Sequence, residues 1–150
     1  MHQSKIETMK SLIFIVALAV FPSTYASSYL ENISGITFSA QKPEECFNFD
    51  NLRTYNCIQH FHNESQEALD AEFKRIMSKI KRDKNLLTDT QDKWLAFRNS
   101  ECKLRSISAQ VFQNPTAQEQ LFFEACAAEL NNTRVDQLKS IHLDCDSCLQ

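Results

Sequence analysis

The sequence predicts an all-α protein: an antiparallel bundle of three main helices with a disulfide-tied N-terminal segment. Three long stretches repeat apolar residues at the three- and four-residue spacing of a helix. One glycine and three prolines in 150 residues leave these stretches almost uninterrupted. Strand-like alternation is weak, and residues 33–39 are the only short candidate. The sequence therefore favours a single small helical domain.

Residues 1–26 have the order of a secretory signal: two lysines, an apolar run at residues 12–21 and a Thr-Tyr-Ala ending. The run is shorter than the roughly 20 apolar residues that a membrane-spanning helix needs. We therefore expect cleavage after Ala26, no stable membrane anchor, and a periplasmic or secreted protein. Met9 is an alternative start that leaves a shorter signal of the same kind.

The chain is mildly acidic. It has 16 basic and 19 acidic residues, and the part that follows residue 26 carries a net charge of −4. A weakly acidic surface attracts a cationic partner at long range and has no general attraction for nucleic acid. The composition therefore suits a protein partner that is basic.

The first helix is expected over residues 63–84, after a flexible lead-in at residues 27–43 that is polar and rich in serine. Leu69, Phe73 and Ile80 lie on one apolar stripe. Acidic residues come early in this helix and basic residues late, which complements the helix dipole. The basic end suits either an anionic polymer or a solvated helix terminus.

The second helix is expected over residues 88–112 and the third over 117–141, with a break at Asn114 and Pro115 between them. Each begins with a pattern typical of a capping box, in which a threonine and a Glu or Gln three residues later bind free backbone amides. The two patterns are Thr88 to Gln91 and Thr116 to Glu119.

Two helical stripes carry polar residues and cysteines where apolar periodicity alone predicts neither. One contains Gln91, Trp94, Arg98 and Cys102, and the other Cys126, Leu130, Arg134 and Leu138. In an antiparallel hairpin, residues equidistant from the turn lie at the same height. Cys102 and Cys126 are equidistant from Asn114 and can be bridged, and the same symmetry predicts a cation–π contact between Trp94 and Arg134.

These stripes resemble the lysozyme inhibitor LprI-like domain, a family of small bacterial envelope proteins, over residues 44–141. Its patterns Q-x-x-W-x-x-x-R-x-x-x-C and C-x-x-x-L-x-x-x-R-x-x-x-L are met at residues 91–102 and 126–138. The resemblance also implies that Cys46 and Cys57 pair, and it places Asp70 in the first helix motif. We interpret the signature residues as structural, with Asp70 and Glu72 as the expected partners of the two arginines.

A C-terminal tail at residues 142–150 lies outside this pattern and contains Cys145 and Cys148. A C-x-x-C sequence can be a redox motif, but no thioredoxin-type strand and helix surround it. With His142 it could also supply three zinc ligands. We favour a structural disulfide, with no metal and no cofactor, although six cysteines allow many pairings.

The sequence indicates no enzyme, because it contains none of the usual nucleophile, paired-carboxylate or phosphate-binding motifs. The resemblance implies a protein that binds and inhibits a lysozyme or a related cell-wall lytic enzyme. C-type lysozymes are strongly basic, and the acidic residues that could attract one are Glu124, Glu129 and Asp136. An immunity or binding module for another periplasmic toxin and a structural accessory of an envelope complex remain alternatives. The oligomeric state is not indicated.

Overall fold

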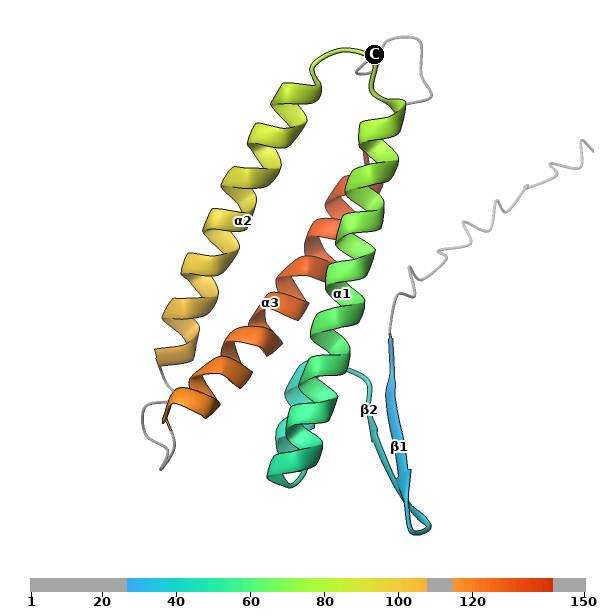
Figure 1. Cartoon of the computed structure of the whole chain (residues 1–150), viewed down its shortest axis with the longest axis vertical. Coiled ribbons are helices and arrows are strands. Elements are labelled where there is room, and N and C mark those ends of the chain that lie inside the picture. Colours follow the sequence, from blue (N-terminus) through green and yellow to red (C-terminus); the bar gives the residue numbers. More distant parts are fainter. Residues whose placement is uncertain (1–26, 108–114, 142–150) are drawn as a thin grey trace, which may run out of the picture.

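The computed structural model describes residues 27–107 and 115–141, which form three long helices and a small β hairpin (Figure 1). The helices are α1 (Asn51–Lys79), α2 (Lys84–Ser106) and α3 (Pro115–Lys139). α3 packs against both α1 and α2. The predicted bundle of three main helices is confirmed, and the hairpin is an addition to it. The predicted signal segment and the tail with Cys145 and Cys148 lie outside the described residues.

The hairpin consists of β1 (Tyr29–Ile33) and β2 (Ile36–Ala40), which are antiparallel. Ser34 and Gly35 form its two-residue turn with φ values of 53° and 82°. Left-handed residues at both turn positions match the natural twist of a hairpin, and glycine adopts this conformation without strain. The expectation of a flexible lead-in at residues 27–43 is therefore wrong over the hairpin.

A short 3-10 helix, η1 (Pro43–Asn48), connects the hairpin to α1. The disulfide between Cys46 and Cys57 ties η1 to α1, as the family resemblance implied. The hydroxyl of Thr54 adds a bond of 2.9 Å to the carbonyl of Cys46. A covalent link and a buried hydrogen bond thus join η1 to α1.

α1 begins at Asn51, well before the expected residue 63. Asp50 is its N-cap, and its carboxylate accepts a hydrogen bond of 3.2 Å from the amide of Arg53. Buried residues follow at helical spacing through the part that was missed: Thr54, Cys57, Ile58 and Phe61. The first helix therefore extends under the hairpin and gives it a surface to pack on.

Both predicted capping boxes are wrong, because each helix begins before its threonine. α2 starts at Lys84, directly after Asp83 in the left-handed conformation. Thr88 already lies within this helix, and its hydroxyl donates to the carbonyl of Lys84 at 3.1 Å. α3 starts with Pro115, a residue that suits the first helical position, so Thr116 is within the first turn.

α3 is the central helix of the bundle, and apolar residues on different faces of it contact both neighbours. One core cluster joins Leu121, Ala125 and Ala128 to α1, η1 and the hairpin. A second joins Val135 and Leu138 to the C-terminal half of α1 and the start of α2. Cys102 of α2 is bonded to Cys126 of α3, as the hairpin symmetry predicted. None of the described helices is long and apolar enough to cross a membrane.

Candidate functional site

The signature residues meet where α2 faces α3. The guanidinium carbon of Arg134 lies 5.6 Å from the centre of the Trp94 ring, so the predicted cation–π contact is confirmed. Arg98, one turn after Trp94 on α2, lies 5.7 Å from the same ring. Two arginines from two helices therefore contact one indole.

Arg98 is the centre of a polar network that joins all three helices. Its Nη1 donates to the side-chain oxygens of Asn131 at 2.8 Å and Gln66 at 3.0 Å. Its Nε and Nη2 donate to Asn99 at 3.1 and 3.0 Å. Asn131 is fully buried, and its amide nitrogen donates to the hydroxyl of Ser65 at 3.2 Å. Every helix thus contributes a polar side chain to one connected group.

Arg134 is bonded to amide groups in the same way. Its Nε donates to Gln91 at 3.2 Å, and its Nη1 donates to Gln137 at 3.2 Å. Gln91 is buried, so this bond gives its side-chain oxygen a partner inside the protein. Burial lowers the pKa of both signature arginines, Arg98 and Arg134, below the ordinary value.

The carboxylates expected to pair with these arginines have other partners. Glu72 accepts hydrogen bonds from Arg75 at 2.6 and 2.8 Å, one turn away on α1. Asp70 accepts from Gln66 at 3.0 Å and acts on Arg98 only through its charge, which opposes the lowering of the arginine pKa. The expected ion pairs are therefore wrong. The amides that replace them, Gln66 and Asn131, lie outside the residues singled out from the sequence.

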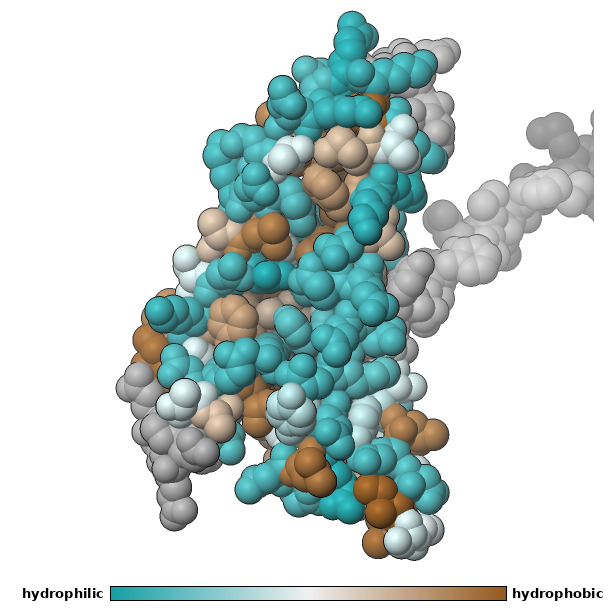
Figure 2. Space-filling model, in the orientation of Figure 1, coloured by the Kyte–Doolittle hydropathy of each residue, from teal (hydrophilic) through white to brown (hydrophobic). Residues whose placement is uncertain are grey.

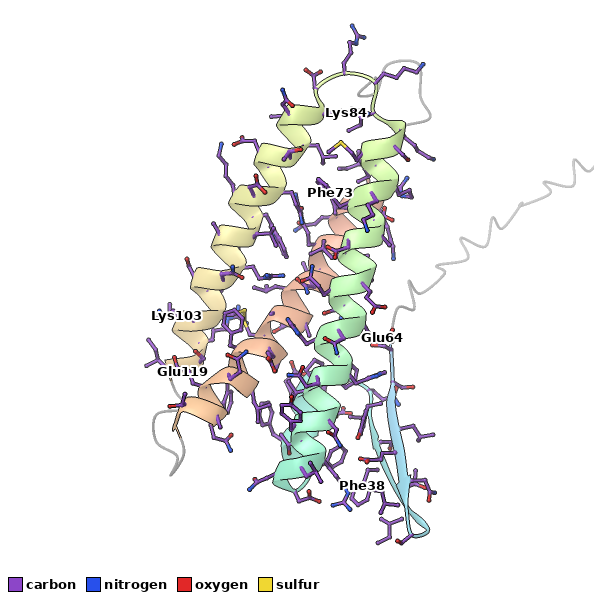
Figure 3. All side chains as sticks on the ribbon, in the orientation of Figure 1. Phe38, Glu64, Phe73, Lys84, Lys103 and Glu119 are labelled. Carbon is purple, nitrogen blue, oxygen red and sulfur yellow. A yellow bond between two sulfur atoms is a disulfide. The ribbon has the colours of Figure 1, made fainter. Side chains whose placement is uncertain are left out.

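The two signature leucines contribute to packing. Leu138 is fully buried in the cluster that joins α3 to the C-terminal half of α1. Leu130 is partly buried against the cluster that contains the Cys102–Cys126 disulfide. Figure 3 shows Phe73 on the side of α1 that faces α2. The structure therefore places the signature on surfaces between helices.

Glu124 does not offer the exposed charge that was expected of it. Its side chain lies between α1 and α3 with 8% of the residue exposed. One carboxylate oxygen accepts a hydrogen bond of 2.7 Å from Gln120, and the other accepts from Gln59 of α1. Burial lowers the pKa of nearby His62, and the charge of Glu124 opposes that change.

Glu129 and Asp136 are exposed and line one groove, together with Glu44 of η1. The groove has a volume of about 470 Å³ and lies between η1, its flanking residues and α3. We call these three carboxylates and the recess the acidic groove. Lys42 also lines it, Glu129 lies 3.4 Å from Nη1 of Arg105, and Asp136 lies 3.9 Å from Nζ of Lys139. Ion pairs of such exposed carboxylates are weak, and both side chains stay more than half exposed.

No group of three or more His, Cys, Asp or Glu side chains within residues 27–107 and 115–141 is arranged to hold a metal ion. The possible zinc ligands of the tail, with His142, lie outside that part of the chain.

Comparison with known proteins assigns the helices to a family. A family model described as "Lysozyme inhibitor LprI" matches residues 50–138. No curated protein and no solved structure matches the chain. The matched range contains α1, α2 and most of α3 with the whole polar network, while the hairpin and η1 precede it. Because this match covers more than half of the 150 residues, the chain belongs to the LprI lysozyme inhibitor family.

Proposed function

We propose that the protein is exported to the bacterial envelope, where it binds and inhibits a basic lysozyme or a related cell-wall lytic enzyme. Membership of a lysozyme inhibitor family carries this proposal. An inhibitor of this kind acts by occupying a surface of the enzyme, so it requires a complementary interface and no catalytic group.

The distribution of charge supports a basic partner. The acidic groove presents exposed carboxylates from both η1 and α3 on one side of the molecule. Complementary charge increases the rate at which two proteins meet and orients them as they do so. We assign the first encounter with the enzyme to this groove, through Glu129 and Asp136, and we assign no contact to buried Glu124.

The disulfides support export. Cys46–Cys57 and Cys102–Cys126 join four fully or nearly buried cysteines, and structural disulfides persist mainly in oxidising compartments such as the periplasm. Together with the signal-like residues 1–26, they support a periplasmic or secreted location.

We further propose that the polar network is structural. The guanidinium groups of Arg98 and Arg134 donate to side chains within the bundle and contact Trp94. Each guanidinium therefore has at least one donor that joins its own helix to another. A change at these positions should alter stability before it alters affinity for an enzyme.

The test is the lysis of bacterial cell walls by c-type, g-type and i-type lysozymes, with and without purified, oxidised residues 27–150. We expect dose-dependent inhibition of one class. If a micromolar excess of the protein inhibits none of the three, the proposal is wrong. A pull-down from periplasm would then address the immunity and accessory alternatives.

The groove has its own test. Reversing both exposed charges, Glu129→Lys with Asp136→Lys, should lower the association rate with the inhibited enzyme by about tenfold and weaken its salt dependence. The matched control, Asp89→Lys with Asp92→Lys, makes the same change of charge on α2, which does not line the groove. Equal losses in the two variants would show that only the net charge matters.

A further inference from the structure

One side of α2 carries exposed apolar residues along its whole length. Leu86, Phe97 and Leu104 are 59%, 56% and 64% exposed. Together with exposed Lys93 they follow one line, because steps of seven, four and seven residues add up to about five full turns of a helix. We call Leu86, Lys93, Phe97 and Leu104 the outer stripe. Figure 2 shows hydrophobic atoms at intervals along α2, in a surface that is mostly hydrophilic.

The outer stripe lies on a side of α2 that the described part of the bundle does not cover. α2 packs mainly on α3, through a separate line of buried residues that includes Leu87, Gln91 and Cys102. Single exposed leucines are common on soluble proteins, but large apolar residues aligned over about five turns of one helix are typical of a contact surface. The outer stripe is therefore a candidate interface.

The order of residues in the outer stripe suits a second copy of the same chain. Leu86 and Leu104 are equidistant from Leu95, and so are Lys93 and Phe97. A second α2 that runs antiparallel, with a two-fold axis at Leu95, therefore places Leu86 against Leu104 and Lys93 against Phe97. Paired leucines bury apolar surface, and an ammonium over a phenylalanine ring makes a cation–π contact. A parallel copy would instead place Lys93 against Lys93, which the repulsion of like charges disfavours.

The charges beside the outer stripe are also complementary between antiparallel copies. Asp89, Ala96 and Lys103 follow one edge of the stripe at steps of seven residues. In the antiparallel pair, Lys103 of one copy lies within about 3 Å of the height of Asp89 of the other. Asp89 accepts a hydrogen bond of 2.7 Å from Lys93 of its own helix, and a carboxylate can accept from a second donor as well. Two-fold symmetry forms this pair of opposite charges twice.

We propose that the protein forms a two-fold symmetric dimer through an antiparallel pair of α2 helices along the outer stripe. Such an interface is self-complementary, because each copy supplies both sides of every contact. A single helix pair is a small interface, so we expect a dissociation constant in the micromolar range. The residues that line the acidic groove include none from α2. The dimer and the proposed inhibition therefore use different surfaces, and neither requires the other.

The experiment is sedimentation velocity of the purified, oxidised protein from low micromolar to several hundred micromolar concentrations. We expect the wild-type protein to pass from monomer to dimer over this range. Leu86→Gln with Leu104→Gln removes both leucines of the stripe and should raise the dissociation constant about tenfold or more. The matched control, Leu30→Gln with Leu52→Gln, changes leucines of β1 and α1 that are 71% and 68% exposed and should alter the constant by less than about twofold. Circular dichroism and thermal melting check that both variants fold.

A charge exchange tests the antiparallel arrangement. Asp89→Lys alone and Lys103→Asp alone each bring like charges together across the interface, so each should weaken the dimer about threefold or more. The two changes in one chain restore opposite charges between antiparallel copies and should return the dissociation constant to within about twofold of wild type. Single variants that dimerise like wild type, or a double variant no stronger than the single ones, would overturn the inference.

Lys93→Glu keeps the inference testable if the leucine variant does not fold, because the side chain of Lys93 is 76% exposed. It should weaken the dimer, since a carboxylate is repelled by the face of the Phe97 ring. A wild-type protein that stays monomeric at several hundred micromolar would overturn the inference and leave the proposed function as it stands. In that case, loss of lysozyme inhibition in the leucine variant would assign the outer stripe to an enzyme. Binding of wild type but not of the variant to phosphatidylglycerol vesicles would assign it to a membrane.

Discussion

Arg134 of α3 lies with its guanidinium carbon 5.6 Å from the centre of the Trp94 ring of α2. Eight residues further along α2, Cys102 is bonded to Cys126 of α3. Eight residues span about 12 Å of a helix. The two helices are therefore joined at two heights, once by a covalent bond and once by a cation–π contact. Both links are compatible with a single register of α2 along α3.

A double-mutant cycle measures the contact between Trp94 and Arg134. We expect Trp94→Leu and Arg134→Gln to be coupled by about 0.5–1 kcal/mol in the free energy of unfolding in urea. The control cycle pairs Trp94→Leu with Arg105→Gln, because Arg105 is bonded to Glu101 and Glu129 instead. A coupling no larger than in the control would show that the stacked geometry contributes nothing to stability.

The buried amide of Asn131 is expected to be a sensitive position in the bundle. Asn131→Ala removes the acceptor for Arg98 and the donor to Ser65, so it should lower the free energy of unfolding by about 2 kcal/mol. Asn99→Ala removes an exposed acceptor from the same arginine and should cost under about 0.5 kcal/mol. Urea unfolding of the two variants measures both losses. Equal decreases in the free energy of unfolding would contradict the importance of burial at Asn131.

Removal of the disulfide between α2 and α3 should destabilise the protein by about 3 kcal/mol. Cys102→Ala with Cys126→Ala opens a loop with a sequence separation of 24, and an unfolded chain without that link has more entropy. The measurement is guanidinium unfolding of the variant and of wild type under oxidising and reducing conditions. Reduction should still destabilise the variant through Cys46–Cys57, and an unchanged midpoint after reduction would contradict a stabilising role for that link.

The hydroxyl of Tyr29 should ionise at a higher pH than that of an ordinary tyrosine. Burial, together with the hydrogen bond of 2.5 Å that it donates to Glu31 and the charge of Glu31, raises the pKa of Tyr29 from the ordinary value of 10.0 to about 12. Because the folded state holds this proton more tightly than the unfolded state, the resulting stabilisation is complete below pH 10 and is lost as the pH rises from 10 to about 12.

The difference in tyrosinate absorbance between wild type and Tyr29→Phe isolates this ionisation. Glu31→Gln removes the charged acceptor and should shift the midpoint towards 10.0. A Tyr29 that ionises near pH 10 in the folded wild-type protein would contradict the buried position of the hairpin base.

The helices were predictable from sequence because helical periodicity is a property of neighbouring residues. The residues at which the helices begin were harder to predict. The repeat of buried residues in α1 reaches back to Thr54, and Asp50 was a recognisable N-cap. The acidic and basic halves of residues 63–84 were the stronger pattern, and they placed the start too late. The start of α2 was also placed too late, because the capping pattern at Thr88 lies inside the helix and looks the same in sequence as one at its end.

The contacts between helices were predictable only where symmetry applied. Equal distances from one turn placed Cys102 beside Cys126 and Trp94 beside Arg134. One partner of Arg98, Gln66, comes from α1. The spacing of residues around the turn between α2 and α3 does not predict where α1 lies. Charge suggested carboxylates, whereas packing brought Gln66 and Asn131 to the guanidinium.

The order of the two disulfides along the chain has a consequence for folding. Cys46 pairs with Cys57 before Cys102 is reached, and Cys102 pairs with Cys126, so the two links neither cross nor enclose one another. A chain that emerges from a translocation channel with its N-terminus first can close the earlier link while the later cysteines are still inside. If the chain is exported as proposed, native pairing of these four cysteines can thus follow the order of delivery.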